Sequence, residues 1–181
     1  MRRDRIAQDE NLVLRVSQGD EAAFREMYDG YSRFVGHIVF SLLGNDCEAD
    51  DVLQETFLEV FRSIGGLRDP SRLRPWIGTI AVRCAYRRLK NRIRHRTGGP
   101  DPEELPQKES STGDPLLIGQ FREALDALPL KLQVPFVLHA VDELPMEQVA
   151  VLCEVSLATV KRRIAKATKR LQKRLSHARA Y

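Results

Sequence analysis

The stretch MEQVAVLCEVSLATVKRRIAKATKRLQKRLSHARAY, at residues 146–181, decides how the C-terminal end of this chain folds. A short amphipathic segment at residues 146–153 is followed by a tight turn at residues 154–155 and by a long segment for which Ser156 is a suitable N-cap. From Ser156 onward the chain contains nine Lys or Arg residues and neither Asp nor Glu. A short helix, a tight turn and a basic helix are the outline of a helix-turn-helix that reads the major groove of DNA.

The last segment is predicted to be a helix with an apolar stripe and an opposing basic side. The apolar residues recur at steps of three and four, and they are Val160, Ile164, Ala167, Leu171 and Leu175. This stripe is expected to pack against Val149 and Leu152 of the short helix. On the opposite side, small residues would allow the helix to approach the groove closely, and basic residues could reach base edges. Hydroxyls in the first turn could meet a phosphate. The residues predicted to contact DNA are Ser156, Ala158, Thr159, Lys161, Arg162, Arg163 and Lys166.

Charge is strongly segregated along the 181 residues, although the net charge is only +4. Residues 41–61 carry six acids and no Lys or Arg, whereas residues 70–100 carry nine Lys or Arg and no acid. Residues 97–115 are acidic again. A charge run is usually a solvated face, but separate blocks of opposite sign favour separate surfaces for separate partners, and the acid-free C-terminal segment favours DNA.

The segment RTGGPDPEELPQKESSTGD, at residues 96–114, is rich in Gly, Pro, Ser and acids and has few apolar residues. Such a composition predicts a flexible linker. We therefore expect two domains, at residues 1–95 and 116–181, joined by an acidic linker at residues 96–115. Because helical periodicity prevails and β-branched alternation is absent, the predicted fold is all-α with two small helical domains.

The N-terminal domain is predicted to begin with a short helix at residues 11–18. A second helix follows Asp20, which suits the N-cap, and ends at Gly44. The buried stripe expected for the second helix is Phe24, Met27, Tyr28, Tyr31, Phe34, Val35, Ile38, Val39 and Leu42. A third helix ends at the glycines 65–66, and its expected stripe is Leu53, Phe57, Val60, Phe61 and Ile64.

A fourth, basic helix is expected after a loop at residues 67–74, because Pro75 suits the first turn of a helix. Cations crowd its later turns, and they are Arg83, Arg87, Arg88, Lys90, Arg92 and Arg94. With Trp76 and Tyr86, the helix has both the charge and the rings that single-stranded DNA binding needs. We nevertheless expect Trp76 to pack in the core. For Tyr86, a place in the core and a place on the surface are equally favoured.

The third helix has an acidic side. Asp51, Glu55 and Glu59 lie opposite its apolar stripe, at about 100° per residue. This side could be a solvated face or a surface that binds a basic protein partner, and periodicity alone favours neither interpretation.

Other classes of function find little support. Cys47, Cys84 and Cys153 lie far apart and favour small buried side chains over a disulfide or a metal site. The histidines show no zinc-ligand spacing, and no nucleophile–base set is found, so neither cofactor, metal nor catalysis is predicted. The N-terminus lacks a signal-like apolar run and no stretch is long enough to span a membrane, which predicts a cytosolic protein.

These residues, in this order, resemble a bacterial RNA polymerase sigma factor of the extracytoplasmic-function (ECF, group IV) class of the sigma-70 family. The most specific likeness is DVLQETF at residues 51–57, which resembles the DLVQETF signature of the family. The other matching motifs are GDEAAF at residues 19–24, PWI at residues 75–77, LDALP at residues 125–129, EQVA at residues 147–150 and TVK at residues 159–161.

The resemblance implies a promoter-specificity subunit. Region 2, at residues 1–95, would bind the clamp helices of the polymerase β′ subunit through Asp50, Asp51, Gln54 and Glu55. The same region would capture a flipped base of the minus-ten element and hold the open strand, with Arg68, Arg72, Arg74, Arg83, Arg87 and Arg88. Region 4, at residues 116–181, would read the minus-thirty-five element and pack against the β flap, while the acidic linker would thread the nucleic-acid channel. An anti-sigma factor is a further expected partner.

The chain departs from the family pattern in two places. Arg83 and Arg87 stand where the family often has Asn and Asp, which bears on minus-ten recognition. Glu154 and Ala158 stand where Gly is frequent, which bears on promoter preference. The main alternative function is a stand-alone helix-turn-helix regulator, which would bind duplex DNA tightly without polymerase. A serine recombinase is disfavoured because it needs strands and a reactive Ser.

Overall fold

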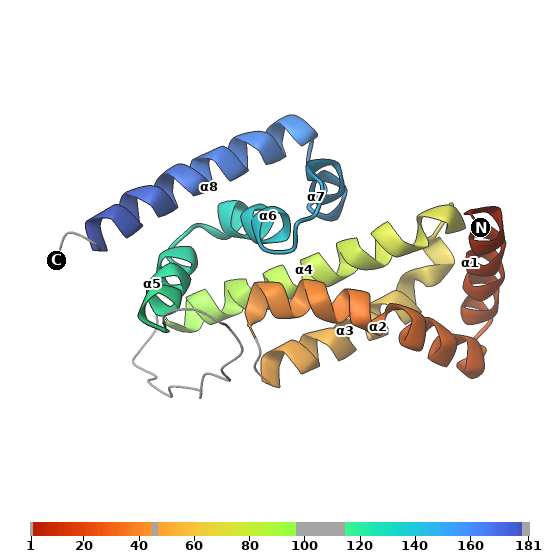
Figure 1. The fold of residues 1–181 in the computed structure, drawn as a ribbon. Helices are drawn as coiled ribbons and strands as arrows, with labels where there is room; N and C mark the ends of the chain where they lie inside the picture. The colour runs from red at the N-terminus through yellow and green to blue at the C-terminus, as the bar shows by residue number, and fades with distance from the viewer. Residues whose placement is uncertain (1, 45–46, 97–114, 179–181) are drawn as a thin grey trace. The chain divides into compact units, whose positions relative to one another are not determined.

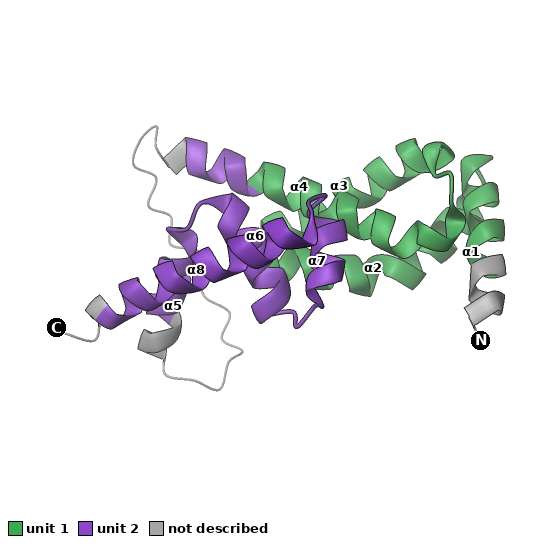
Figure 2. Ribbon diagram, turned by 90° about the horizontal axis from the view of Figure 1, so that it is seen from above, with its two compact units in different colours: residues 1–88 green, residues 89–181 purple. Residues whose placement is uncertain are grey.

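The computed structural model describes residues 2–44, 47–96 and 115–178, and these ranges contain helices and no strand (Figure 1). The predicted all-α fold is therefore confirmed. The chain forms two compact units, Met1–Arg88 and Leu89–Tyr181 (Figure 2). Nearly all of the predicted linker, residues 97–114, lies outside the described residues, so the predicted domain boundaries stay predictions. Within the described ranges, no helix has both the length and the apolar character needed to cross a membrane.

The first unit begins with helix α1 (Arg2–Ser17). The prediction of a short helix at residues 11–18 was wrong in extent, because the first turns are polar and leave no apolar stripe to detect. The elements that follow are α2 (Glu21–Leu43), α3 (Cys47–Ser63), the 3₁₀ turns η1 (Ile64–Gly66) and η2 (Pro70–Arg72), and α4 (Leu73–Arg96), whose last turns from Leu89 onward belong to the second unit. Helix α2 packs on α1 and α3, and α1 also contacts η1 and η2.

The ends of α2 are those that the sequence predicts. Oδ1 of Asp20 accepts hydrogen bonds from the backbone N–H groups of Ala22 and Ala23, at 2.9 and 3.1 Å, and thereby caps the helix. At the other end, Gly44 has a φ of 89°, a left-handed conformation that glycine adopts without steric cost. Its N–H donates to the carbonyl of Phe40 at 2.8 Å and closes the last turn.

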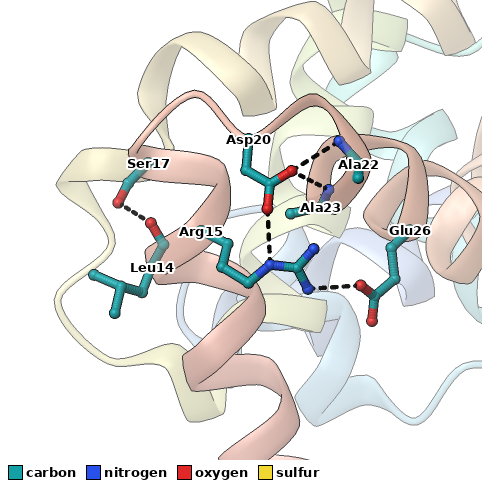
Figure 3. Close-up of polar contacts among 7 residues, drawn as sticks. All are labelled: Leu14, Arg15, Ser17, Asp20, Ala22, Ala23 and Glu26. Carbon is teal, nitrogen blue, oxygen red and sulfur yellow. Dashed lines mark hydrogen bonds and ion pairs between the residues drawn. The ribbon is translucent and has the colours of Figure 1, made fainter.

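A side-chain network fastens the start of α2 to the end of α1 (Figure 3). Nε of Arg15 donates to Oδ2 of Asp20 at 2.9 Å, and Nη1 of Arg15 donates to Oε2 of Glu26 at 3.0 Å. The backbone hydrogen bond from Ala23 and the side-chain contact with Arg15 hold the pKa of Asp20 below its ordinary value of 3.8. Arg15 belongs to no apolar stripe or motif, and the sequence therefore did not predict its role.

Replacing Asp20 with Ala should lower the melting temperature of the protein by about 5 °C, because both the helix cap and the Arg15 partner are lost. The folded-state pKa of Asp20 is depressed, so this stabilisation is full above pH 3.8 and disappears as the pH falls through the folded-state pKa. Melting curves of the wild type and the variant should therefore converge in acid. Asp20→Asn, which keeps a capping oxygen but no charge, should lose less stability, and curves that stay equally separated at all pH values would contradict this assignment.

The core of the first unit contains the inner stripes of α2 and α3, together with buried residues of α1 and α4. Most of the predicted α2 stripe is buried, namely Met27, Tyr31, Val35, Ile38, Val39 and Leu42. Three aromatic residues at its edge, Phe24, Tyr28 and Phe34, are only half-buried. The rings of Phe24 and Phe61 meet edge-on, with their centroids 5.0 Å apart. The ring centroids of Tyr28 and Phe57 are 4.6 Å apart.

The stripe of α3 is rotated relative to the prediction. Val52 and Thr56 are fully buried beside Phe57, whereas Phe61, predicted to be buried, is 42% exposed. Thr56 tolerates burial because its hydroxyl donates to the carbonyl of Val52 at 2.7 Å. The predicted stripe omitted both Val52 and this threonine and therefore lay displaced toward Phe61.

The second unit contains α5 (Pro115–Asp126), α6 (Leu130–Ala140), α7 (Met146–Leu152) and α8 (Leu157–Ala178). Helix α8 packs on the other three, and α6 also contacts α7 (Figure 1). Helix α6 continues through Pro135. Nδ1 of His139 lies 2.8 Å from the carbonyl oxygen of Leu144, which can only accept, so the proton is on Nδ1 and ties α6 to the segment that leads into α7.

Candidate DNA and protein interfaces

The turn between α7 and α8 is closed by two backbone hydrogen bonds. The N–H of Val155 donates to the carbonyl of Ala150 at 3.0 Å, and the N–H of Glu154 donates to that of Val151 at 3.1 Å. This pair of bonds is the Schellman arrangement, which requires a left-handed residue after the helix. Glu154 occupies that position with a φ of 54°. A sharp turn of this kind sets the orientation of α8 relative to α7.

Replacing Glu154 with Gly should stabilise the second unit by about 1 kcal/mol, because glycine adopts the left-handed conformation without the steric cost of a side chain. The midpoint of urea unfolding measures the change. Glu154→Ala is the matched control, since it removes the same charge but keeps a Cβ at the strained position. Equal gains from the Gly and Ala variants would show that charge, and not backbone conformation, sets the effect.

The first turn of α8 is capped by Ser156, as predicted. Oγ of Ser156 accepts a hydrogen bond from the N–H of Thr159 at 3.3 Å and lies 2.9 Å from the hydroxyl oxygen of Thr159. Ser156 is exposed and Thr159 is half-buried. The two hydroxyls predicted to meet a phosphate are therefore hydrogen-bonded to each other, and a phosphate would meet them as a pair.

The two sides of α8 are arranged as predicted. Val160, Ile164, Ala167 and Leu171 are buried, and Leu175 is half-buried. The opposite side is exposed at each position predicted to face the groove, namely Ala158, Arg162 and Lys166. Of the two residues predicted for its flanks, Lys161 is exposed and Arg163 is half-buried. The predicted stripe is confirmed, and the DNA contacts assigned to the exposed side stay predictions.

The acidic side of α3 faces outward but is not free of partners. Asp50, Asp51 and Gln54 are exposed and Glu55 is half-buried. Nη2 of Arg87 donates to Oε1 of Glu55 at 3.0 Å, and Nη2 of Arg88 lies 3.7 Å from Oδ2 of Asp51. Two residues predicted for a protein partner thus pair with two predicted for DNA, a contact between α3 and α4 that no motif indicates.

Arg87 is also held by the thiol of a neighbouring turn. Its Nη2 lies 3.2 Å from Sγ of Cys84, which is buried. Burial raises the pKa of the Cys84 thiol, and contacts with Thr56 and Arg87 partly oppose that rise. Burial also raises the pKa of Cys153, to about 11, so both thiols are protonated and unreactive at neutral pH. The side chain of Cys47 lies outside the described residues.

The arginines predicted for the minus-ten element form two groups. Arg68, Arg72 and Arg74 are exposed around η2 and the first turn of α4, whereas Arg83, Arg87 and Arg88 follow later on α4. The rise of an α-helix places Arg87 about 20 Å beyond Arg74. Of the two aromatic residues on this helix, Trp76 is half-buried and Tyr86 is 38% exposed. The six arginines are therefore spread along η2 and α4 and do not converge on one point.

A helix-turn-helix with an acid-free basic side, in a chain whose other unit carries an acidic and a basic helix side, is the arrangement expected of a DNA-binding protein. Two family models match the chain, "Sigma-70 region 2" over residues 27–95 and "Sigma-70, region 4" over residues 118–171. The chain belongs to the sigma-70 family of RNA polymerase sigma factors, in the ECF class, and is an alternative sigma factor.

Curated relatives agree with this assignment. The ECF RNA polymerase sigma-E factor of Escherichia coli K12 is 28% identical over 174 residues, which are 88% of this chain and 90% of the relative. The RNA polymerase sigma-H factor of Pseudomonas aeruginosa is 26% identical and matches 93% of this chain and 94% of its own. The ECF sigma factor SigE of Mycolicibacterium smegmatis is 30% identical over 85% of this chain, which spans only 63% of that relative.

Two solved structures share the fold. CnrH, solved in complex with the cytosolic domain of CnrY, superposes with a TM-score of 0.63 at 20% identity and covers 93% of this chain and 97% of its own. The sigma factor RpoE of Bartonella quintana, solved with the anti-sigma factor NepR, has a TM-score of 0.63 at 22% identity and covers 84% of this chain and 96% of its own.

Proposed function

We propose that this chain binds core RNA polymerase and directs it to promoters through two separate DNA contacts, without chemistry of its own. The observation that carries the proposal is the outer side of α8, which is exposed, basic and free of acids behind a tight helix-turn-helix turn. Membership of the sigma-70 family supports the role of polymerase subunit over that of a stand-alone regulator.

In the first unit, we assign the outer side of α3 to the clamp helices of the β′ subunit. Asp50 and Gln54 are exposed there, and Asp51 and Glu55 lie beside them with arginine partners. The two arginine groups of η2 and α4 are assigned to the opened minus-ten region, where cations follow the backbone of a single strand.

In the second unit, α8 is assigned to the minus-thirty-five element and the rest of the unit to the β flap. The acidic linker is assigned to the nucleic-acid channel of the polymerase. An anti-sigma factor is a further proposed partner, because the sigma factor of Bartonella quintana that shares this fold was solved with one. We assign the protein to the cytoplasm, where these proposed partners would act.

Run-off transcription with purified core polymerase on a library of candidate promoters tests the proposal. We expect transcripts from a small subset of templates, and only when the chain is present. Duplex binding by the chain alone should be weak on the same templates. Tight duplex binding without polymerase, together with no promoter-dependent transcript, would assign the chain to stand-alone regulators.

A further inference from the structure

Arg74 and Phe34 form a cation–π pair that joins the first turn of α4 to the middle of α2. The guanidinium carbon of Arg74 lies 4.0 Å from the centroid of the Phe34 ring. Arg74 is exposed and Phe34 is half-buried, so one face of the guanidinium covers the ring while the side chain remains accessible to solvent. A planar cation held in this way presents its other face outward.

The surroundings of the pair are open and contain further cations. Gly30 lies one turn before Phe34 on α2, and a Cβ at Gly30 would meet nothing within 4 Å. Two further cations, Arg68 and Arg72, are exposed close by in the sequence, before and within η2. An open space, a flat cation and additional positive charge are together the features with which proteins hold an unstacked base and its phosphates.

The exposure of the pair argues against a purely structural role, because cation–π contacts at exposed sites contribute little to stability. What the aromatic ring adds is orientation, because it fixes the plane of a guanidinium that would otherwise rotate freely. A fixed plane matters for a ligand that stacks and much less for one that only needs charge.

We propose that the outer face of the Arg74 guanidinium stacks on an unpaired base of the opened promoter strand, and that Phe34 is the positioning residue that holds Arg74 flat. This inference rests on the proposed function and deepens it, since it adds α2 to the surface that binds single-stranded DNA. It also assigns Arg74 a role different from that of Arg68 and Arg72, which would contact phosphates.

The test uses holoenzyme reconstituted with the full chain and a promoter that the wild type transcribes. The probe is a fluorescein-labelled single-stranded oligonucleotide with the non-template sequence of the minus-ten region, and a matching set in which each base in turn is replaced by an abasic site. Binding is measured by fluorescence anisotropy for Phe34→Leu, Phe34→Tyr, Arg74→Ala and the Phe34→Leu/Arg74→Ala double variant. Thermal unfolding of each variant reports whether the fold is kept.

For the wild type, one abasic position should weaken binding about tenfold, which is the loss of one stacked base. Arg74→Ala should weaken binding of the intact probe by a similar factor. In this variant, the abasic site at that position should cause no further loss of affinity. Phe34→Leu should weaken binding about threefold, as expected for loss of an exposed cation–π contact, and Phe34→Tyr should match the wild type. The double variant should bind no more weakly than Arg74→Ala, since Phe34 acts through Arg74.

Three results would overturn the stacking role while leaving the proposed function intact: wild-type binding by Phe34→Leu, multiplied losses in the double variant, or unchanged abasic sensitivity in Arg74→Ala. A wild-type chain that directs no transcription from any promoter would overturn both. A structural role for Phe34 would lower the melting temperature without changing the abasic profile, and that pattern also counts against the proposal.

Discussion

Replacing Arg162 with Ala should lower transcription from a promoter that depends on its minus-thirty-five element by about tenfold or more, because a base-reading arginine contributes about 1–3 kcal/mol of discrimination. Arg162 lies on the exposed side of α8, opposite the buried Val160 and Ile164, and so its loss should leave the core of the second unit intact. Lys166→Ala, one turn further along the same side, should act in the same direction. Run-off transcription from matched promoters with intact and scrambled upstream elements measures the effect.

Arg174→Ala is the matched control for Arg162→Ala. It removes the same exposed side chain from the same helix, about 18 Å further along the axis, beyond the reach of the groove contacted by the first turns. Core binding, measured by competition with a labelled wild-type chain, should be unchanged for both variants. If core binding falls with Arg162→Ala, the outer side of α8 faces polymerase and not DNA, and the assignment of this helix is wrong.

Replacing Phe57 with Ala should reduce the free energy of unfolding of the first unit by about 3–5 kcal/mol, because a large buried ring leaves a cavity. Phe57 is 2% exposed and its ring packs 4.6 Å from that of Tyr28. A loss of this size is a large part of the stability of a typical domain, so core binding should fail together with the fold. Denaturant unfolding followed by circular dichroism measures the change.

Phe61→Ala provides the comparison, because it removes the same ring from the same helix. Phe61 is 42% exposed and has an edge-on contact with Phe24, so its loss should cost only about 1 kcal/mol. The sequence alone predicts the two substitutions to be equivalent. Equal destabilisation by Phe57→Ala and Phe61→Ala would show that α3 is oriented as its apolar periodicity first suggested.

The sequence was sufficient for features that depend on a single helix and its ends. Asp20 and Gly44 mark the two ends of α2, as predicted. The buried and exposed sides of α8 follow from its own periodicity. Family resemblance supplied the function, because the signature at residues 51–57 is specific where charge patterns are not.

Features that depend on the rotation of one helix against another were not predictable. Phe34 belongs to the apolar stripe of α2 by spacing, yet it lies at the edge and meets Arg74 of another helix. The pairing of Arg87 with Glu55 likewise joins residues 32 positions apart. Periodicity defines the faces of one helix but not which residues of a neighbouring helix they meet, and long charged side chains widen that uncertainty.

The two ion pairs between α3 and α4 alter what binding at the acidic side would involve. A cation from another protein that reaches Glu55 or Asp51 would replace Arg87 or Arg88 instead of filling a vacant place. Binding would then be an exchange, in which the number of ion pairs on α3 is unchanged and screening by salt weakens the pairs on both sides alike. We therefore expect that core binding depends only weakly on salt concentration, and that the displaced arginines are left facing outward beside the DNA.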